Sequence, residues 1–228
     1  MTKLNEIWKE AAPKQVFSTW LGALNSYRAM ADLRPVSESE RLSRDDRKHA
    51  DYLVMNHGRL TMGAGMHDEA PAAPGFSPEG RIAASQSNVN QAMFIGDPPA
   101  DWAINGWIEA PFHRGPLLNP NLSTVGYGES CQSQFCAAAL NVQAGSQRAR
   151  HDFVTPRPIL FPPDKSSVPL AVSSIRNEWP SPITSCPGYK FPTGPAITIQ
   201  LGGDFDARLG DFSVLSEGQQ LAACAFDS

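Results

Sequence analysis

Apolar residues recur at helical spacing in two stretches near the start of the chain. The first stripe, between residues 14 and 31, contains Trp20, Leu24 and Tyr27, which stand three or four residues apart. A second stripe predicts a helix that opens at Ser37 and ends near Gly58, because Ser37 and Glu40 have the spacing of a capping box. Its inward positions mix apolar and polar residues: Leu42, Asp46, His49, Ala50 and Leu53.

The middle of the chain alternates between a long loop, a third helix and two strands. Residues 59–77 are rich in Gly, Pro and Ala, and a loop of that length is usually functional or disordered. After it, helical spacing returns and is broken at Pro111. Strand-like runs follow at about residues 123–129 and 135–143. The third helix is expected to bury four apolar side chains: Trp102, Ile104, Trp107 and Ile108.

The composition changes at Thr155, where prolines become dense and remain so up to Pro195. Such a stretch favours extended backbone over helix. Three strand-like runs lie beyond it, at residues 196–201, 212–215 and 220–226. They predict a small β-rich, sandwich-like module, and because so few strands leave an unprotected edge, a truncated module is the alternative.

Composition and charge restrict the class of protein. A formal net charge of -4 and a pI near 5.7 exclude the basic surface that nucleic acid requires. No apolar run approaches the length that spans a bilayer. The first ten residues carry charges where the apolar core of a signal peptide would lie. Two readings follow: a cytosolic protein, or a mature secreted form with an added start.

The four cysteines favour an oxidising compartment. Cys131 and Cys136 lie where the two central strands are expected to form a hairpin, so they can face each other closely enough for a disulfide. Cys186 and Cys224 lie in the Pro-rich part and are expected to pair with each other. Four cysteines allow three connectivities, of which local pairing is the simplest. Free thiols or a metal clip are the alternatives, although no neighbouring His or Cys completes a zinc set.

Several motifs, in order, resemble the bacterial branch of the CAP superfamily (cysteine-rich secretory proteins, antigen 5 and pathogenesis-related 1). The most informative segment, residues 105–128, runs Asn-Gly-Trp-Ile-Glu-Ala-Pro-Phe-His-Arg, then Leu-Leu-Asn-Pro and Val-Gly-Tyr-Gly. Further likenesses lie at residues 24–28, 42–53 and 67–80. The resemblance implies an α+β fold in which residues 14–154 form an α-β-α sandwich. Residues 1–13 are then an N-terminal extension, and residues 155–228 are the Pro-rich linker and the β-rich module.

The same resemblance implies a cavity lined by His67 and His113, with Glu109 four residues before the second histidine. Some members of the family bind a divalent metal such as zinc there, and imidazole suits both metal binding and proton transfer. Where the family usually carries a second groove acid, this chain has Gln86-Ser87-Asn88. Ser87 and Asn88 are therefore candidate groove residues. Glu69 or Glu79 is the candidate for the missing carboxylate.

Four other basic residues receive structural interpretations. His49 lies on the core stripe of the second helix and is expected to be a hydrogen-bonded packing residue. His57, near the end of that helix, is expected to interact with the helix dipole. Arg114 is expected on the surface, and the alternative is that it orients a carboxylate of the cavity. His151 is expected on the surface.

The predicted function is that of a secreted CAP-domain protein whose His-lined groove binds a metal ion, lipid, glycan or peptide, or a protein partner. The alternative is a metal-dependent or Ser/His hydrolase that acts on extracellular substrates. For the latter, Ser85 and Ser87 are the candidate nucleophiles. The chain has no Gly-x-Ser-x-Gly elbow, phosphate-binding loop or His-Glu-x-x-His motif, so the binding protein is the favoured interpretation.

Overall fold

The fold is taken from a computed structural model that describes residues 17–60, 63–146, 158–166, 168, 178, 181–201 and 209–226. Residues 1–13 and His151, to which the sequence assigns an extension and a surface position, lie outside the described residues. So do residues 14–16 of the first predicted helix.

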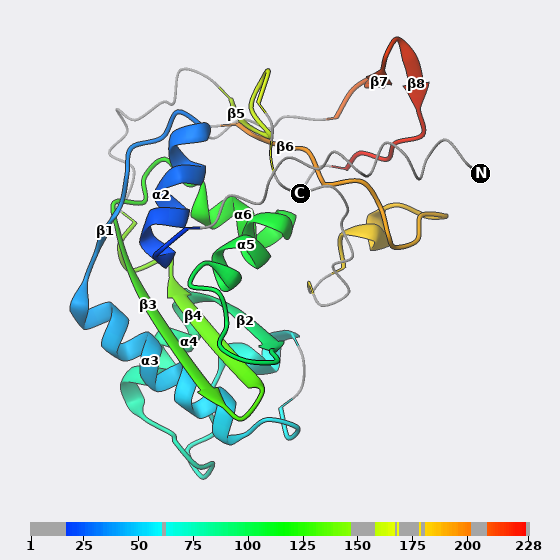
Figure 1. Ribbon diagram of the computed structural model, residues 1–228. Helices are drawn as coiled ribbons and strands as arrows, with labels where there is room; N and C mark the ends of the chain where they lie inside the picture. The colour runs from blue at the N-terminus through cyan, green and yellow to red at the C-terminus, as the bar shows by residue number, and fades with distance from the viewer. Residues whose placement is uncertain are drawn as a thin grey trace.

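A four-stranded sheet forms the centre of the N-terminal part (Figure 1). Its order is β1 (Ser37–Glu38), β3 (Thr124–Gln132), β4 (Phe135–Asn141) and β2 (Ser87–Met93). β1 pairs with β3 in parallel, and the other two pairings are antiparallel. The two strands predicted from the sequence are β3 and β4, which confirms a mostly antiparallel sheet.

β3 and β4 form a tight hairpin whose two turn residues are Ser133 and Gln134. Ser133 has a φ of 56°, which a two-residue hairpin of this handedness requires. The register places Cys131 directly opposite Cys136, with Cα atoms 4.1 Å apart, and the two form a disulfide. The predicted local pairing is therefore confirmed.

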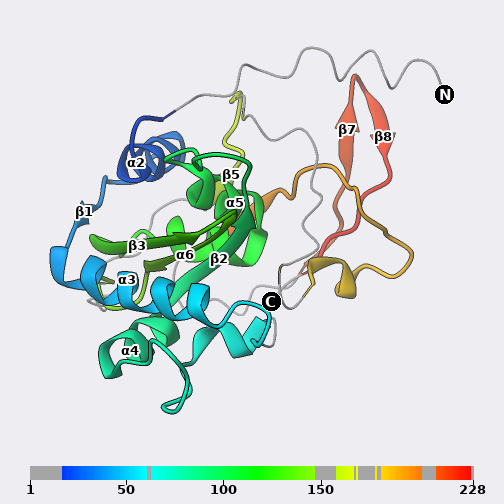
Figure 2. The same cartoon turned by 60° about the horizontal axis from the view of Figure 1, so that its bottom comes forward.

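Helices cover both faces of the sheet (Figure 2). On one face lie α2 (Trp20–Met30), α5 (Trp102–Glu109) and α6 (Pro111–Leu117), and on the other lie α3 (Glu40–Met55) and α4 (Pro78–Gln86). β4 divides between two apolar clusters because successive side chains point to opposite faces. Ala138 and Leu140 pack with α2 and α5, whereas Phe135 and Ala137 pack with α3. The predicted α-β-α sandwich is thus confirmed.

Two helix starts differ from the sequence predictions. Residues 17–19 are not helical, because the Thr19 side chain accepts a hydrogen bond from the Gly22 amide and caps α2. The capping box predicted at Ser37 is wrong. The Ser37 and Ser39 amides donate to the Ser123 and Val125 carbonyls, so this segment joins the sheet and Ser39 caps α3.

The long segment after α3 is not without structure. α3 ends at Met55, and the side-chain amide of Asn56 donates to the Tyr52 and Pro74 carbonyls, each at 2.8 Å. The Asn56 amide therefore joins the start of the loop to Pro74, 18 residues further along the chain. Within the loop, residues 63–67 form a short 3-10 helix that ends at His67.

α3 lies directly on β3, and two glycines permit the close contact. A Cβ atom at Gly126 would overlap the backbone of Leu42 and Ser43, and one at Gly128 would overlap the backbone of Asp46 and Arg47. The Val-Gly-Tyr-Gly motif therefore has a packing role: its two glycines face the helix, and Tyr127 points the other way, where its ring stacks on Trp20.

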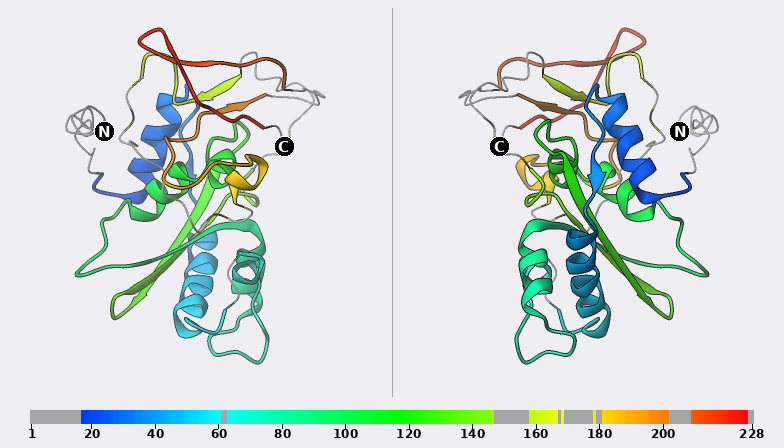
Figure 3. Two further views of the ribbon diagram at one scale, coloured as in Figure 1. Left: turned by 90° about the vertical axis from the view of Figure 1, so that its right-hand side faces the viewer. Right: turned by 90° about the vertical axis from the view of Figure 1, so that its left-hand side faces the viewer.

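The C-terminal part is strand-rich, as predicted. β5 (Ile159–Phe161) pairs with β6 (Thr198–Gln200), and β7 (Val214–Ser216) pairs with β8 (Gln219–Leu221). The described strands thus form two separate pairs rather than one sandwich. Figure 3 shows β5 and β6 next to α2 at the end of the main sheet, and the side chains of Ile159 and Phe161 join the apolar cluster of α2 and α5.

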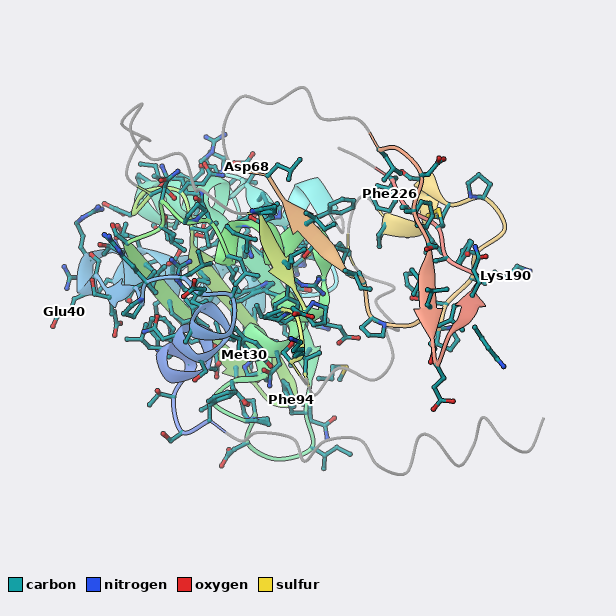
Figure 4. All side chains as sticks on the ribbon, turned by 90° about the horizontal axis from the view of Figure 1, so that it is seen from above. Met30, Glu40, Asp68, Phe94, Lys190 and Phe226 are labelled. Atoms are coloured by element: carbon teal, nitrogen blue, oxygen red, sulfur yellow. A yellow bond between two sulfur atoms is a disulfide. The ribbon has the colours of Figure 1, made fainter. Side chains whose placement is uncertain are left out.

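The second pair, β7 and β8, stands beside the layered body, on the side where Lys190 lies (Figure 4). A disulfide between Cys186 and Cys224 closes a stretch of 38 residues there, as predicted. It joins the short 3-10 helix at Pro182–Ser185 to the chain beyond β8. The division into two domains at residue 155 stays a prediction.

Because α3 and β3 are in close contact, a single methyl group added between them is expected to destabilise the fold. Gly128→Ala is expected to lower the free energy of unfolding by at least about 2 kcal/mol, because helix backbone and strand must separate. Gly115→Ala is the matched control: nothing lies within 4 Å of its Cβ position, so the change should be neutral or stabilise α6 by up to about 1 kcal/mol. Urea unfolding measures both, and equal stabilities of the two variants would contradict the contact.

Candidate functional site

His67 stands at the end of the 3-10 helix and faces the start of β2. Its Nδ1 lies 3.2 Å from the Ala84 carbonyl oxygen; because a carbonyl only accepts, Nδ1 carries the proton. Burial lowers the pKa of His67, the carbonyls of Ala84 and Ser87 oppose this, and the imidazoles of His113 and His49 lower it further. His67 and His113 are therefore close enough to interact electrostatically.

His113 lies in the first turn of α6, just after the break at Pro111 that the sequence predicts. Its Nδ1 is 3.1 Å from Oε1 of Glu178, a residue 65 positions further along the chain. The same oxygen accepts hydrogen bonds from the amides of Phe112, at 2.7 Å, and His113, at 3.1 Å. On the other side, the Asn88 side chain donates to the His113 carbonyl at 2.8 Å. Asn88 thus contacts the histidine predicted as its neighbour, through the backbone.

Ser87 takes part in a different, buried network. Its hydroxyl donates to Oδ1 of Asp46 at 2.7 Å, and the Asn141 amide donates to Oδ2 at 3.0 Å. Asp46 is fully buried, and burial raises its pKa from 3.8 to about 7, although both hydrogen bonds oppose the shift. Asp46 therefore connects α3 to β2 through Ser87 and to β4 through Asn141.

Glu69 forms a buried pair with His49. The two side chains are fully buried, with Oε1 of Glu69 3.0 Å from Nδ1 of His49. The Met66 carbonyl lies 2.9 Å from the other ring nitrogen, and the Ser77 amide donates to Oε2 of Glu69 at 3.0 Å. His49 is the hydrogen-bonded packing residue predicted from the sequence. Both oxygens of Glu69 are engaged in this pair and its loop, so Glu69 supports the segment that carries His67.

Arg114 is fully buried, and its predicted surface position is wrong. Its guanidinium donates to the carbonyls of Ile108, at 2.6 Å, and Ala196, at 2.7 Å, and lies 4.6 Å from the centre of the Phe161 ring. Burial lowers its pKa to about 10, and the carboxylates of Glu178 and Glu109 act in the opposite direction. The surface interpretation failed because the β5–β6 pair, which covers Arg114, is far away in the sequence.

Glu109 ends α5, four residues before His113. Its backbone carbonyl accepts a hydrogen bond from Arg114 at 3.4 Å, and its side chain is half-buried. Glu79, the other candidate for the missing acid, is exposed and forms an ion pair with Lys48 at 3.1 Å. His57 lies two residues beyond α3, where its exposed ring stacks on Phe135 with centroids 3.6 Å apart; its interaction with the helix dipole stays a prediction.

The described part of the chain holds no cluster of three metal ligands. A tightly held metal needs about three protein ligands, and across the described ranges no three His, Cys, Asp or Glu side chains converge in that way. The two histidines are brought near each other, whereas Glu69 and Glu79 make their described bonds elsewhere. The carboxylate that reaches His113 is Glu178, which sequence reasoning missed. Its only signal in the sequence was an acidic residue at the start of the run Glu178-Trp-Pro-Ser-Pro182.

A comparison with family models agrees with this fold. The family model described as the cysteine-rich secretory protein family (CAP) matches residues 21–142, more than half of the chain, and the chain therefore belongs to this family. None of the described helices is long and apolar enough to cross a membrane.

Solved structures show weaker likeness. An extracellular protein with an SCP domain from Bacillus anthracis is 17% identical, with a TM-score of 0.38, over 53% of this chain and 38% of that one. An outer surface protein from Borrelia burgdorferi is 17% identical, with a TM-score of 0.35, over 51% and 83%. A cysteine-rich secretory protein from Staphylococcus aureus is 14% identical, with a TM-score of 0.33, over 53% and 36%. A search of curated proteins finds no match.

The buried Asp46 predicts a characteristic pH dependence of stability. Its pKa is raised on folding from 3.8 to about 7, so between these values the folded protein keeps a proton that the unfolded chain releases. Asp46 therefore contributes on the order of 4 kcal/mol to the free energy of unfolding below pH 3.8. This contribution is lost as the pH rises from 3.8 to about 7.

Asp46→Asn should remove this component, since the amide can still accept from Asn141 and donate to Ser87. Urea unfolding at pH 4 and pH 7.5 measures it. The wild type should lose stability relative to Asp46→Asn as the pH rises, and a constant difference between the two proteins would contradict the shift.

Proposed function

We propose that this protein is secreted and binds a ligand through the neighbouring imidazoles of His67 and His113. Secretion is supported by membership of the secretory protein family and by the two disulfides, which persist in oxidising compartments. Binding is supported by the position of the two histidines, which come from the two helical layers of the sandwich and approach each other beside the start of β2.

The observation that carries the proposal is the hydrogen bonding of His113. Because an ionised carboxylate only accepts, Nδ1 of His113 carries the proton that Glu178 binds, and the lone pair of the neutral ring lies on Nε2. Nε2 has no hydrogen-bond partner among the described residues, and one fifth of the side chain is exposed. A partly exposed acceptor with a fixed orientation suits a ligand that offers N–H or O–H donors, such as a glycan or a peptide.

The serine-dependent hydrolase receives no support from the described contacts. Ser87 donates its hydroxyl to Asp46, and Ser85 donates to the Ile82 carbonyl at 2.8 Å. Neither hydroxyl has an imidazole as its described partner, whereas an activated serine requires a base within hydrogen-bond reach. A metal-dependent hydrolase would need a third ligand beside the two histidines.

A titration of the imidazole resonances tests the proposal. The probes are a chito-oligosaccharide, an unstructured peptide, fatty-acid micelles and zinc chloride, each added to the wild type and to His67→Ala, His113→Ala and His57→Ala. At least one of the first three probes should shift both the His67 and the His113 resonances. Its affinity should fall at least about tenfold in both site variants, the loss of one or two buried hydrogen bonds.

His57→Ala is the matched control, because its ring is exposed and stacks on Phe135 instead of facing the two site histidines. Zinc should bind only weakly. Unchanged affinity in the site variants would refute the proposed binding site. Zinc-dependent turnover of casein or an ester, lost in both site variants, would replace the binding protein with a hydrolase.

A further inference from the structure

Glu178 is a buried carboxylate that a distant part of the chain brings to His113. It is 4% exposed, and one of its oxygens, Oε1, receives all three of its described hydrogen bonds. Two of these come from successive backbone amides at the start of α6, and the third comes from the imidazole ring. Glu178 therefore holds both the backbone and the side chain of His113, which fixes the ring against the helix that carries it.

The negative charge of this carboxylate has a nearby counterpart. Arg114 is fully buried, and the charge of Glu178 stabilises its protonated form. Removing a buried charge from water is costly unless opposite charge and hydrogen bonds compensate for it. The second oxygen, Oε2, is buried without a hydrogen bond among the described residues. The charge of Arg114 and the three donors on Oε1 are thus what compensates the burial of Glu178.

Arg114 in turn holds the same C-terminal region. Its guanidinium donates to the Ala196 carbonyl at 2.7 Å and to the Thr198 hydroxyl at 3.2 Å. Two consecutive residues of α6, His113 and Arg114, are therefore each bonded to a residue beyond position 155. Loose packing of the C-terminal region on the sandwich would not require buried, charged contacts at both His113 and Arg114.

The residue of β2 that contacts His113 is Asn88, which carries no charge. Asn88 donates to the backbone carbonyl of His113, and neither Glu69 nor Glu79 has His113 as a described partner. The carboxylate of Glu178 is bonded to the His113 ring at 3.1 Å. The acid at His113 therefore comes from a segment 65 residues further along the chain and reaches the ring through Nδ1.

We infer that Glu178 is a positioning residue: it fixes the orientation and the Nδ1–H tautomer of His113, so that residues beyond the sandwich complete the binding site. The inference rests on the proposed function for the role of His113, and on geometry alone for the contact. A carboxylate that orients an imidazole in this way commonly sets which ring nitrogen remains available to a ligand. Here the available nitrogen is Nε2.

The test is the tautomer of His113, read from the ¹⁵N imidazole spectrum of the ligand-free protein above the pH at which the ring is charged. The wild type should show a proton on Nδ1 and an unprotonated Nε2. Glu178→Ala should lose this preference and the Nδ1 proton signal. Glu178→Gln should restore the signal, since its carbonyl oxygen can still accept.

Glu79→Ala is the matched control, because it removes a carboxylate that is exposed and bonded to Lys48. It should leave the His113 spectrum unchanged. A His113 ring protonated on Nε2 in the wild type, or a folded Glu178→Ala variant with an unchanged tautomer, would overturn the inference. If Glu178→Ala does not fold, the wild-type and Glu178→Gln spectra decide.

The outcome is independent of the titration of ligands described above. An Nδ1–H tautomer that depends on Glu178, together with no binding of any probe, would leave the positioning role intact and refute the proposed function. If a probe binds only when both histidines are present, and the His113 tautomer is the same without Glu178, the proposed function stands and the positioning role of Glu178 is refuted.

Discussion

The direct contact between the backbones of α3 and β3 is the constraint on which the rest of the structure depends. It exists because the strand presents Gly126 and Gly128 to the helix, so that no side chain separates the two. At that distance the polar side chains on the inner face of α3 cannot reach water, and they must find partners inside. Asp46 bonds to β2 and β4, and His49 bonds to Glu69 and the Met66 carbonyl.

Two sets of contacts position the site, one on the α3 side of the sheet and one on the opposite side. On the α3 side, His49 and Glu69 hold the loop on which His67 stands, one residue after Met66. On the opposite side, His113 is held by Asn88 of β2 and by Glu178. The two imidazoles therefore belong to different layers, and both lie beside the start of β2. Contacts on the α3 side fix the His67 ring and contacts on the α6 side fix the His113 ring. The sheet between the two layers fixes where the two rings lie relative to each other.

Local patterns predicted most of the sandwich, because its elements carry their own signals. The stripes of α3 and α5, the break at Pro111, the hairpin of β3 and β4 and the Cys131–Cys136 disulfide follow from residues close in sequence. The two candidate histidines also came from local motifs. What failed depended on distant segments. Ser37 pairs with β3 and cannot open a helix, Arg114 is covered by β6, and Glu178 reaches α6 across 65 residues. No periodicity in the sequence encodes such contacts.

The central claim is that the two layers bring His67 and His113 close enough to interact, and the titration of His67 tests it most directly. The charge that His113 carries when it is protonated is one of the causes that hold the pKa of His67 below its ordinary value. In His113→Gln the pKa of His67, followed by ¹H–¹³C NMR of the ring, should therefore rise toward that value, while burial still keeps it low. An unchanged pKa of His67 in a folded His113→Gln protein would show that the two imidazoles do not interact, and it would contradict the account.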